Sequence, residues 1–294
     1  MRIFICALML INSASFASGG QTTPYYADLS DPKDLSPALI GGSVADPADW
    51  PASPWVGNCS STLISSKVLI TAAHCVSNGG SKSFTINNTR YTASCTHNPS
   101  YRGNSTADWA LCLVSQPVVG IKFESIATER EASCATGVKY LWTGYGCQRW
   151  GGNIDGKFRI GMVSTIKCPS GTDYDTVTRG SVALCSGDSG GGGYVMFQNG
   201  DRKVVGTNSR SNTTDTSYVS STYTEKFRDW AKSWAESKNV SICGIHSDAE
   251  SCRVVGDNPS PGPKDCGSEL ASAMTSLSDH VASQTALKAC LESN

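Results

Sequence analysis

From Leu39 onward, the hydrophobic positions of the chain fall into short runs separated by turns rich in Gly, Asn and Ser. The runs read STLISSKVLITAA, WALCLV, VKYLWTGYG, RIGMVSTIK, YVMF and KVVGTNS. Short apolar runs divided by turn signals are typical of an all-β barrel or sandwich. The 29 glycines among 294 residues fit a chain with many turns. We therefore expect an all-β domain.

One later segment, EKFRDWAKSWAESK, has the spacing of a helix. Phe227, Trp230, Ala231 and Trp234 recur at positions i, i+3, i+4 and i+7, which places them on one helical face. The pattern predicts an amphipathic helix that ends the β domain near Lys238. Residues 239–294 differ from what precedes them, because four cysteines are crowded there. We expect a small Cys-containing extension with a terminal helix.

The first residues predict export from the cell. MRIFICALMLINSASFAS carries one positive charge at Arg2, an apolar run and small residues at Ser15 and Ala17. We assign residues 1–17 to a signal peptide and residues 18–38, which are polar and contain proline, to a pro-segment or linker. The apolar run is too short to span a bilayer, and no later stretch is long enough. The expected location is extracellular or periplasmic, without an integral membrane segment after signal removal.

Charge and cysteine usage narrow the function classes. A formal net charge of -1 provides no electrostatic reason to expect nucleic acid as a partner. Of the 13 cysteines, Cys6 lies in the predicted signal, and the remaining even set fits a disulfide framework. There is no CxxC pair, and the chain has only four histidines. We therefore expect neither a metal nor another cofactor.

Three segments hold residues suited to nucleophilic catalysis. Ser189 lies in the glycine-rich run CSGDSGGGG, and a serine nucleophile needs a base within hydrogen-bond reach. His74 ends the apolar run LITAAH, flanked by Cys59 and Cys75, whose pairing would fix its loop and contribute about 3 kcal/mol. Asp108 directly precedes the apolar run WALCLV. Each residue alone is equally compatible with an ordinary turn, so the assignment depends on all three together.

An α/β-hydrolase is one alternative, because GDSGG also satisfies G-x-S-x-G. That class places its histidine after the serine and alternates strands with helices around a parallel sheet. Only His246 and His280 follow Ser189, both in the extension, and the preceding pattern is of short strands. Both observations disfavour this class.

The segments LIGG, LITAAHC, HNPSYRGNSTADWALCLV and CSGDSGG, in this order, resemble the chymotrypsin/trypsin family of secreted serine endopeptidases. The resemblance covers residues 39–238. It implies two six-stranded antiparallel β-barrels with a C-terminal helix, and a protease that needs no cofactor. The implied partners are protein or peptide substrates, with protein inhibitors as further candidates.

The resemblance also implies a role for each residue. His74 would act as general base and then general acid, Asp108 would orient it, and Ser189 would attack the scissile carbonyl. The backbone N–H groups of Gly187 and Ser189 would form the oxyanion hole. A catalytically silent homologue that binds a target is the alternative, and the presence of all three residues favours the enzyme.

The resemblance also implies activation by proteolysis. In relatives, the residue that matches Asp188 pairs with the amino group freed when a pro-segment is removed. The matching amino terminus here is Leu39, so the chain would be a zymogen cut after Ala38. Relatives activated by trypsin carry a basic residue before the cut, and Ala38 departs from that pattern. We expect activation by an enzyme that accepts Ala38, or by the protein itself.

Substrate specificity is harder to predict. Ala183 matches the base of the primary pocket and cannot pair with Lys or Arg, so basic specificity is not expected. Ser209 and Ser211 match the pocket wall. Arg210 between them either favours acidic groups or is a solvated loop residue.

The remaining disulfides are predicted from the segments that they bracket. Cys95 with Cys112 would enclose the segment before Asp108, and Cys168 with Cys185 the approach to Ser189. Cys134 would then pair with Cys147 by elimination. Relatives usually have a cysteine near Tyr140 and another after the reactive serine, and this chain has neither.

Overall fold

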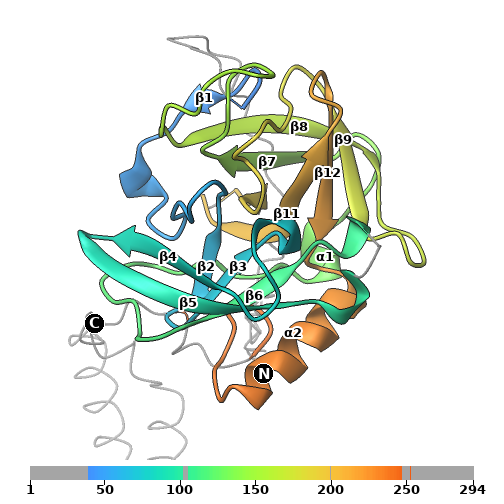
Figure 1. The fold of residues 1–294 in the computed structure, drawn as a ribbon. Helices are drawn as coiled ribbons and strands as arrows, with labels where there is room; N and C mark the ends of the chain where they lie inside the picture. The colour runs from blue at the N-terminus through green and yellow to red at the C-terminus, as the bar shows by residue number, and fades with distance from the viewer. Residues whose placement is uncertain (1–38, 102–104, 199, 247–251, 253–294) are drawn as a thin grey trace, which may run out of the picture.

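The computed structural model describes residues 39–101, 105–198, 200–246 and 252. The predicted signal peptide, pro-segment and terminal helix lie outside these residues. Two antiparallel β-sheets lie against one another, with a helix near the end of the described residues (Figure 1). Within the described part, no helix is long and apolar enough to cross a membrane.

One sheet closes into a six-stranded barrel. Its antiparallel order is β8-β7-β10-β11-β12-β9, and a further pairing of β8 with β9 closes the ring. The short strand β1 pairs with the first two residues of β8. The strands are β1 (Ser43–Val44), β7 (Lys139–Gly144), β8 (Arg159–Lys167), β9 (Asp175–Arg179), β10 (Gly192–Met196), β11 (Arg202–Ser211) and β12 (Thr216–Ser221).

The other sheet is a curled half-barrel of five strands in the order β2-β3-β6-β5-β4. Side chains that alternate along β5 fall in turn on the buried and exposed faces, as expected for a sheet with one face in the core. The strands are β2 (Thr62–Ser65), β3 (Val68–Thr71), β4 (Ser81–Ile86), β5 (Thr89–His97) and β6 (Ala110–Val114). Together the two sheets confirm the predicted all-β, trypsin-like architecture, with one six-stranded barrel as expected and, in the described residues, a five-stranded half-barrel in place of the second.

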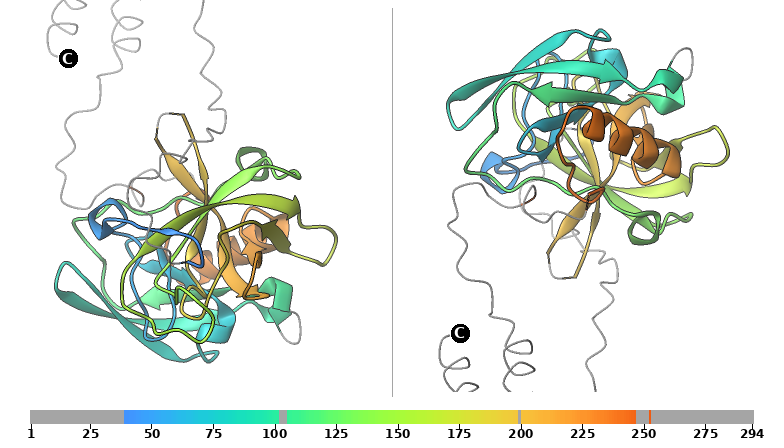
Figure 2. Two further views of the ribbon diagram at one scale, coloured as in Figure 1. Left: turned by 90° about the horizontal axis from the view of Figure 1, so that it is seen from above. Right: turned by 90° about the horizontal axis from the view of Figure 1, so that it is seen from below.

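The helices complete the fold. The predicted amphipathic helix is α2 (Glu225–Ser237), and it buries Phe227, Ala231 and Trp234. Figure 2 shows it from below, lying across the molecule. Its Phe227 ring contacts Trp109 at a centroid distance of 5.3 Å, so α2 supports the segment that contains Asp108. Helix α1 (Glu129–Ala132) is a single turn before β7. It begins with a capping box between Thr128 and Glu131.

Two predicted disulfides are confirmed and two are wrong. Cys59 pairs with Cys75, and Cys95 with Cys112. The predicted Cys168–Cys185 and Cys134–Cys147 pairs are replaced by Cys134–Cys168 and Cys147–Cys185. A fifth bond joins Cys243 to Cys252.

The register of the β7–β8 hairpin explains the corrected pairing. Lys139 at the start of β7 lies opposite Ser164 near the end of β8, so the residues before β7 and after β8 share one end of the hairpin. Cys134 and Cys168 lie at that end. Cys147 follows the opposite end of β7, where its backbone N–H donates to the Ser186 carbonyl at 2.9 Å and brings it beside Cys185.

Candidate active site

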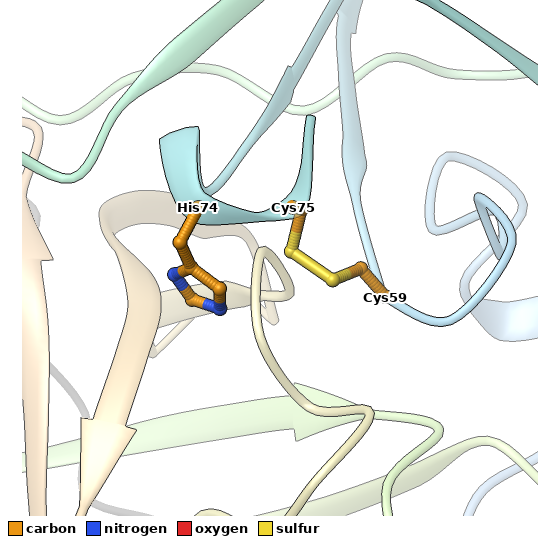
Figure 3. A group of neighbouring side chains, drawn as sticks. All are labelled: Cys59, His74 and Cys75. Atoms are coloured by element: carbon orange, nitrogen blue, oxygen red, sulfur yellow. A yellow bond between two sulfur atoms is a disulfide. The ribbon is translucent and has the colours of Figure 1, made fainter. Parts of the chain in front are cut away.

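His74 and Asp108 are brought together by neighbouring strands. His74 lies on a single 3-10 turn, Ala73–Cys75, directly after β3, and Asp108 lies two residues before β6. The β3–β6 pairing sets Thr71 opposite Ala110, so the residues just beyond these two ends must meet. The Cys59–Cys75 disulfide anchors the turn from its other side (Figure 3).

The Asp108 carboxylate is buried and accepts three hydrogen bonds. His74 Nδ1 lies 2.6 Å from Oδ2, the His74 backbone N–H donates to Oδ1 at 2.9 Å, and Ser209 Oγ donates to Oδ2 at 2.7 Å. A carboxylate can only accept, so Nδ1 carries the proton and Nε2 is the acceptor nitrogen of the neutral ring. The His74 side chain is 37% exposed, which leaves Nε2 able to meet a reacting group.

The loop that contains Ser189 lies against the same end of β3. Gly190 has a φ of +82°, and a Cβ there would lie 2.1 Å from Thr71 Oγ1 and 3.0 Å from the Ala72 nitrogen. The Ser189 carbonyl accepts a hydrogen bond from the Ser60 backbone N–H at 2.8 Å. The loop therefore adjoins the turn that holds His74, although its serine lies far away in the sequence.

Gly187 has a backbone conformation and surroundings that favour glycine. Its φ is +100°, which L side chains rarely adopt, and a Cβ would lie 2.9 Å from Ile154 Cδ1 and 3.0 Å from Gly146 Cα. Ser60 Oγ donates to the Gly187 carbonyl at 2.8 Å. This bond turns the carbonyl toward Ser60 and fixes the peptide orientation next to Ser189.

Asp188 is a completely buried carboxyl held by backbone donors. The Gly146 N–H donates to its Oδ1 and the Cys185 N–H to its Oδ2, both at 2.8 Å. The Cys147–Cys185 disulfide ties together the two segments that supply these donors. Burial raises the pKa of Asp188 to about 7, against the opposing effect of the two hydrogen bonds and of the positive charge of Arg159.

Leu39, the predicted new amino terminus, is fully buried. It belongs to an apolar cluster that also contains Trp142 and Leu184. The next residue, Ile40, accepts a hydrogen bond on its carbonyl from the Ala183 N–H at 2.9 Å. The start of the predicted domain thus contacts the segment that leads to Ser189.

A pocket of about 210 Å³ adjoins Ser189. Two of the three residues predicted for substrate binding, Ser209 and Ser211, line it, whereas Ala183 is fully buried and does not. The other lining residues are Trp150, Leu184, Cys185, Ser186, Arg210 and Thr213.

Arg210, which the sequence left as either a substrate-binding or a solvated residue, forms an ion pair within the protein. Its guanidinium binds the buried carboxylate of Asp175 and lies 4.6 Å from the centre of the Tyr218 ring. Burial raises the pKa of Asp175 to about 6, while the charge and hydrogen bond of Arg210 oppose that rise. The Arg210 charge is thus directed at Asp175.

Cys59, His74 and Cys75 place three potential metal ligands within 4.8 Å of one another. The two sulfurs are bonded to each other, as Figure 3 shows, so neither is a thiolate able to bind a metal. The described residues contain no other such group.

Sequence reasoning missed the residues that hold the serine loop from outside. Ser60 bonds to Gly187 and Ser189, Gly146 bonds to Asp188, and Cys147 bonds to Cys185. Of these, only Cys147 carries a signal in the sequence, and its predicted pairing with Cys134 is wrong.

Comparison with known proteins agrees with this architecture. The family model described as Trypsin matches residues 39–231. A solved structure titled as an atomic resolution structure of HBP is 20% identical, with a TM-score of 0.56, covering 67% of this chain and 96% of its own. Human heparin binding protein is also 20% identical, with a TM-score of 0.55, covering 66% and 95%. At this identity the likeness shows the fold alone. No curated protein matches the sequence.

Proposed function

The chain belongs to the trypsin family, and on that premise we propose that it is a secreted serine endopeptidase using His74, Asp108 and Ser189. The observation that carries the proposal is the Asp108 carboxylate, which accepts hydrogen bonds from His74 and from Ser209. Ser209 in turn lines the pocket that adjoins Ser189. One buried carboxylate therefore links the base to the pocket of the nucleophile.

The proposed reaction has two halves. Ser189 Oγ attacks the scissile carbonyl while His74 Nε2 accepts the hydroxyl proton, and Asp108 stabilises the imidazolium that forms. The tetrahedral oxyanion is met by the N–H groups of Gly187 and Ser189. His74 then donates its proton to the leaving amine, which leaves an acyl-enzyme. Water, deprotonated by His74, attacks the acyl group, and His74 returns the proton to Ser189 Oγ as the carboxylic acid product leaves.

Secretion is supported by disulfide content. The described residues contain five disulfide bonds, which form and persist in oxidising compartments. The predicted signal peptide provides the route. Mass spectrometry of the exported chain would detect removal of residues 1–17.

Activation by cleavage after Ala38 is part of the proposal. Asp188 is buried with its pKa raised, and an amino group placed beside it would offset the cost of its charge. Leu39 is buried and its neighbour Ile40 bonds to Ala183, six residues before Ser189. N-terminal sequencing of secreted, active material tests this step. Active protein that always retains residues before Leu39 would overturn it.

Labelling with a fluorophosphonate tests the catalytic assignment. We expect one adduct per molecule on the mature protein, located at Ser189 by peptide mass spectrometry. Ser189→Ala and His74→Ala should abolish labelling, whereas Ser186→Ala, a serine that also lines the pocket, should retain it. Absence of labelling in mature protein, together with no digestion of casein, would refute the proposal and favour the non-catalytic binding module.

A further inference from the structure

A groove of about 890 Å³ lies along one side of the half-barrel. Its walls are residues 47–57, the β4–β5 hairpin and residues 120–122. Figure 1 shows the hairpin and the segment that follows β1 on the same side of the molecule. Among the described residues, none lines both this groove and the pocket beside Ser189. The aromatic and larger aliphatic side chains that line the groove are Trp50, Trp55, Phe84, Ile86, Ile121 and Tyr145.

The charged residues that line the groove are cations. Among the described lining residues these are Arg90 and Lys122, and none is Asp or Glu. The Lys122 side chain is 75% exposed, and its ion pair with the exposed Asp201 at 3.6 Å contributes little energy. The ammonium of Lys82 lies beside the lining residue Gly57, 3.7 Å from where a Cβ would be. The groove therefore favours a segment with both apolar and acidic side chains.

The chain that follows the described residues begins close to this groove. The Cys243 carbonyl accepts a hydrogen bond from the Ile126 N–H at 2.8 Å. Cys252 is bonded to Cys243, with 5.4 Å between their Cα atoms, and packs against the same buried cluster as the groove residue Ile121. Ile126 follows Ile121 by five residues, a span of at most about 18 Å. Residues 253–294 therefore start within reach of the groove.

The C-terminal extension contains a segment with the properties that the groove favours. Residues 265–283, DCGSELASAMTSLSDHVAS, have three acidic residues and no Lys or Arg. Residues 253–264, which precede this segment, span about 40 Å when fully extended, so they can bring it to the groove. The hydrophobic spacing predicts a helix whose apolar face consists of Leu270, Met274, Leu277 and Val281.

We propose that the groove binds the protein's own C-terminal extension. The apolar face of residues 265–283 packs on the aromatic and aliphatic lining, as amphipathic helices do in the grooves of their partners. The carboxylates of the segment lie toward Arg90, Lys122 and Lys82, which carry the complementary charge. Because the segment belongs to the same chain, a short linker keeps its effective concentration at the groove high.

The groove also adjoins the loop that contains Ser189. Trp55 and Tyr145 both line the groove, and their rings lie 5.6 Å apart. A Cβ at Gly187 would lie 3.3 Å from the Trp55 ring. The docked extension therefore narrows the access of protein substrates to Ser189, a consequence that rests on the proposed protease function. Small reagents still reach the serine.

Carbodiimide crosslinking of the full chain in the Ser189→Ala background tests the docking. The reagent joins a carboxylate to a lysine amine in contact with it. We expect products within one molecule that link Lys122 or Lys82 to a carboxylate of residues 265–283, located by peptide mass spectrometry. The exposed Lys232 on α2 is the internal control and should give a much smaller yield. Equal yield at Lys232 would overturn the proposal. Links formed only between two molecules would assign the groove to a second copy and would also overturn it.

Variants of the extension test the apolar contact. Met274→Asp/Leu277→Asp places two charges on the predicted apolar face and should lower the crosslink yield at Lys122 by about tenfold or more, because a few apolar anchors carry most of such binding energy. Ser272→Asp/Ser276→Asp adds the same charge away from that face and is the matched control, which should keep the parent yield. An equal loss in both variants, or no loss in either, would refute the docking.

Casein digestion by the active protein tests the effect on access. Rates are expressed per Ser189 titrated with fluorophosphonate. Met274→Asp/Leu277→Asp should digest casein severalfold faster than Ser272→Asp/Ser276→Asp, whereas the small reagent should label both variants at the same rate. Equal casein rates would overturn the effect on access and leave the docking to the crosslinking result. Absence of both labelling and digestion would refute the protease function alone, because the crosslinking uses the Ser189→Ala chain.

Discussion

The buried carboxyl of Asp188 predicts how stability changes with pH in the uncleaved chain. Its pKa rises from an ordinary value of 3.8 to about 7 because burial disfavours the charged form. In the folded state the carboxyl keeps its proton up to about pH 7, whereas in the unfolded state it loses the proton near pH 4. The unfolded state thus binds fewer protons over this window, and the free energy of unfolding falls as pH rises.

The size of the effect follows from the two pKa values. A rise from 3.8 to about 7 corresponds to about 4 kcal/mol, present in full below pH 4 and lost above pH 7. Asp188→Asn cannot ionise and should not show this loss. We expect the stability difference between Asp188→Asn and its parent to change by about 4 kcal/mol in favour of the variant between pH 4 and pH 8.

Urea unfolding in a Ser189→Ala background, which prevents self-digestion, measures this difference. A change of about 4 kcal/mol shifts the midpoint by more than about 1 M. Asp175, whose pKa is also raised, is present in both proteins and cancels in the comparison. A stability difference that stays constant from pH 4 to pH 8 would refute the reasoning.

The same assay on chain cleaved at Leu39 tests the activation proposal. The freed amino group would pair with Asp188 and lower its pKa, so the loss of stability between pH 4 and pH 7 should disappear. The loss persisting unchanged after cleavage would show that the pair does not form.

Three further predictions concern the supports of the site. Asp108→Asn removes the acceptor that holds the His74 Nδ1 proton, and kcat on a peptide substrate should fall by about 10⁴-fold, the loss already known for this substitution in the family; an unchanged kcat would contradict the assignment. The Cys147→Ser/Cys185→Ser double variant removes a disulfide between residues 38 positions apart, so the free energy of unfolding should fall by about 4 kcal/mol. Fluorophosphonate labelling should also slow, because the two backbone donors to Asp188 are no longer tied together. Phe227→Ala should lower the free energy of unfolding by about 3–5 kcal/mol, read by urea denaturation, because the ring is fully buried against Trp109; a change below 1 kcal/mol would show that α2 is not held there.

The strands that could be predicted from sequence are those rich in branched apolar residues. RIGMVSTIK coincides with β8, and WALCLV contains β6. Strand β12, TSYVSS, was missed because serine and threonine dominate it, although Ser217, Ser220 and Ser221 are fully buried. Their hydroxyls are satisfied inside the barrel, for example by the bond between Ser221 and Thr176 at 2.7 Å. Hydropathy alone does not distinguish such a strand from a polar loop.

The proposed catalytic residues and the pocket beside Ser189 differ in how far the sequence could predict them. His74 and Asp108 each lie beside an apolar strand, and the pairing of those strands at Thr71 and Ala110 brings the two side chains together, as the combined pattern of segments predicts. The pocket depends on a contact between a side chain and a backbone carbonyl 27 positions apart, Ser211 to Leu184. Every residue has a backbone carbonyl, so the sequence around Ser189 does not show which one Ser211 contacts. Ala183, the position predicted by its spacing from Ser189, is fully buried and does not line this pocket.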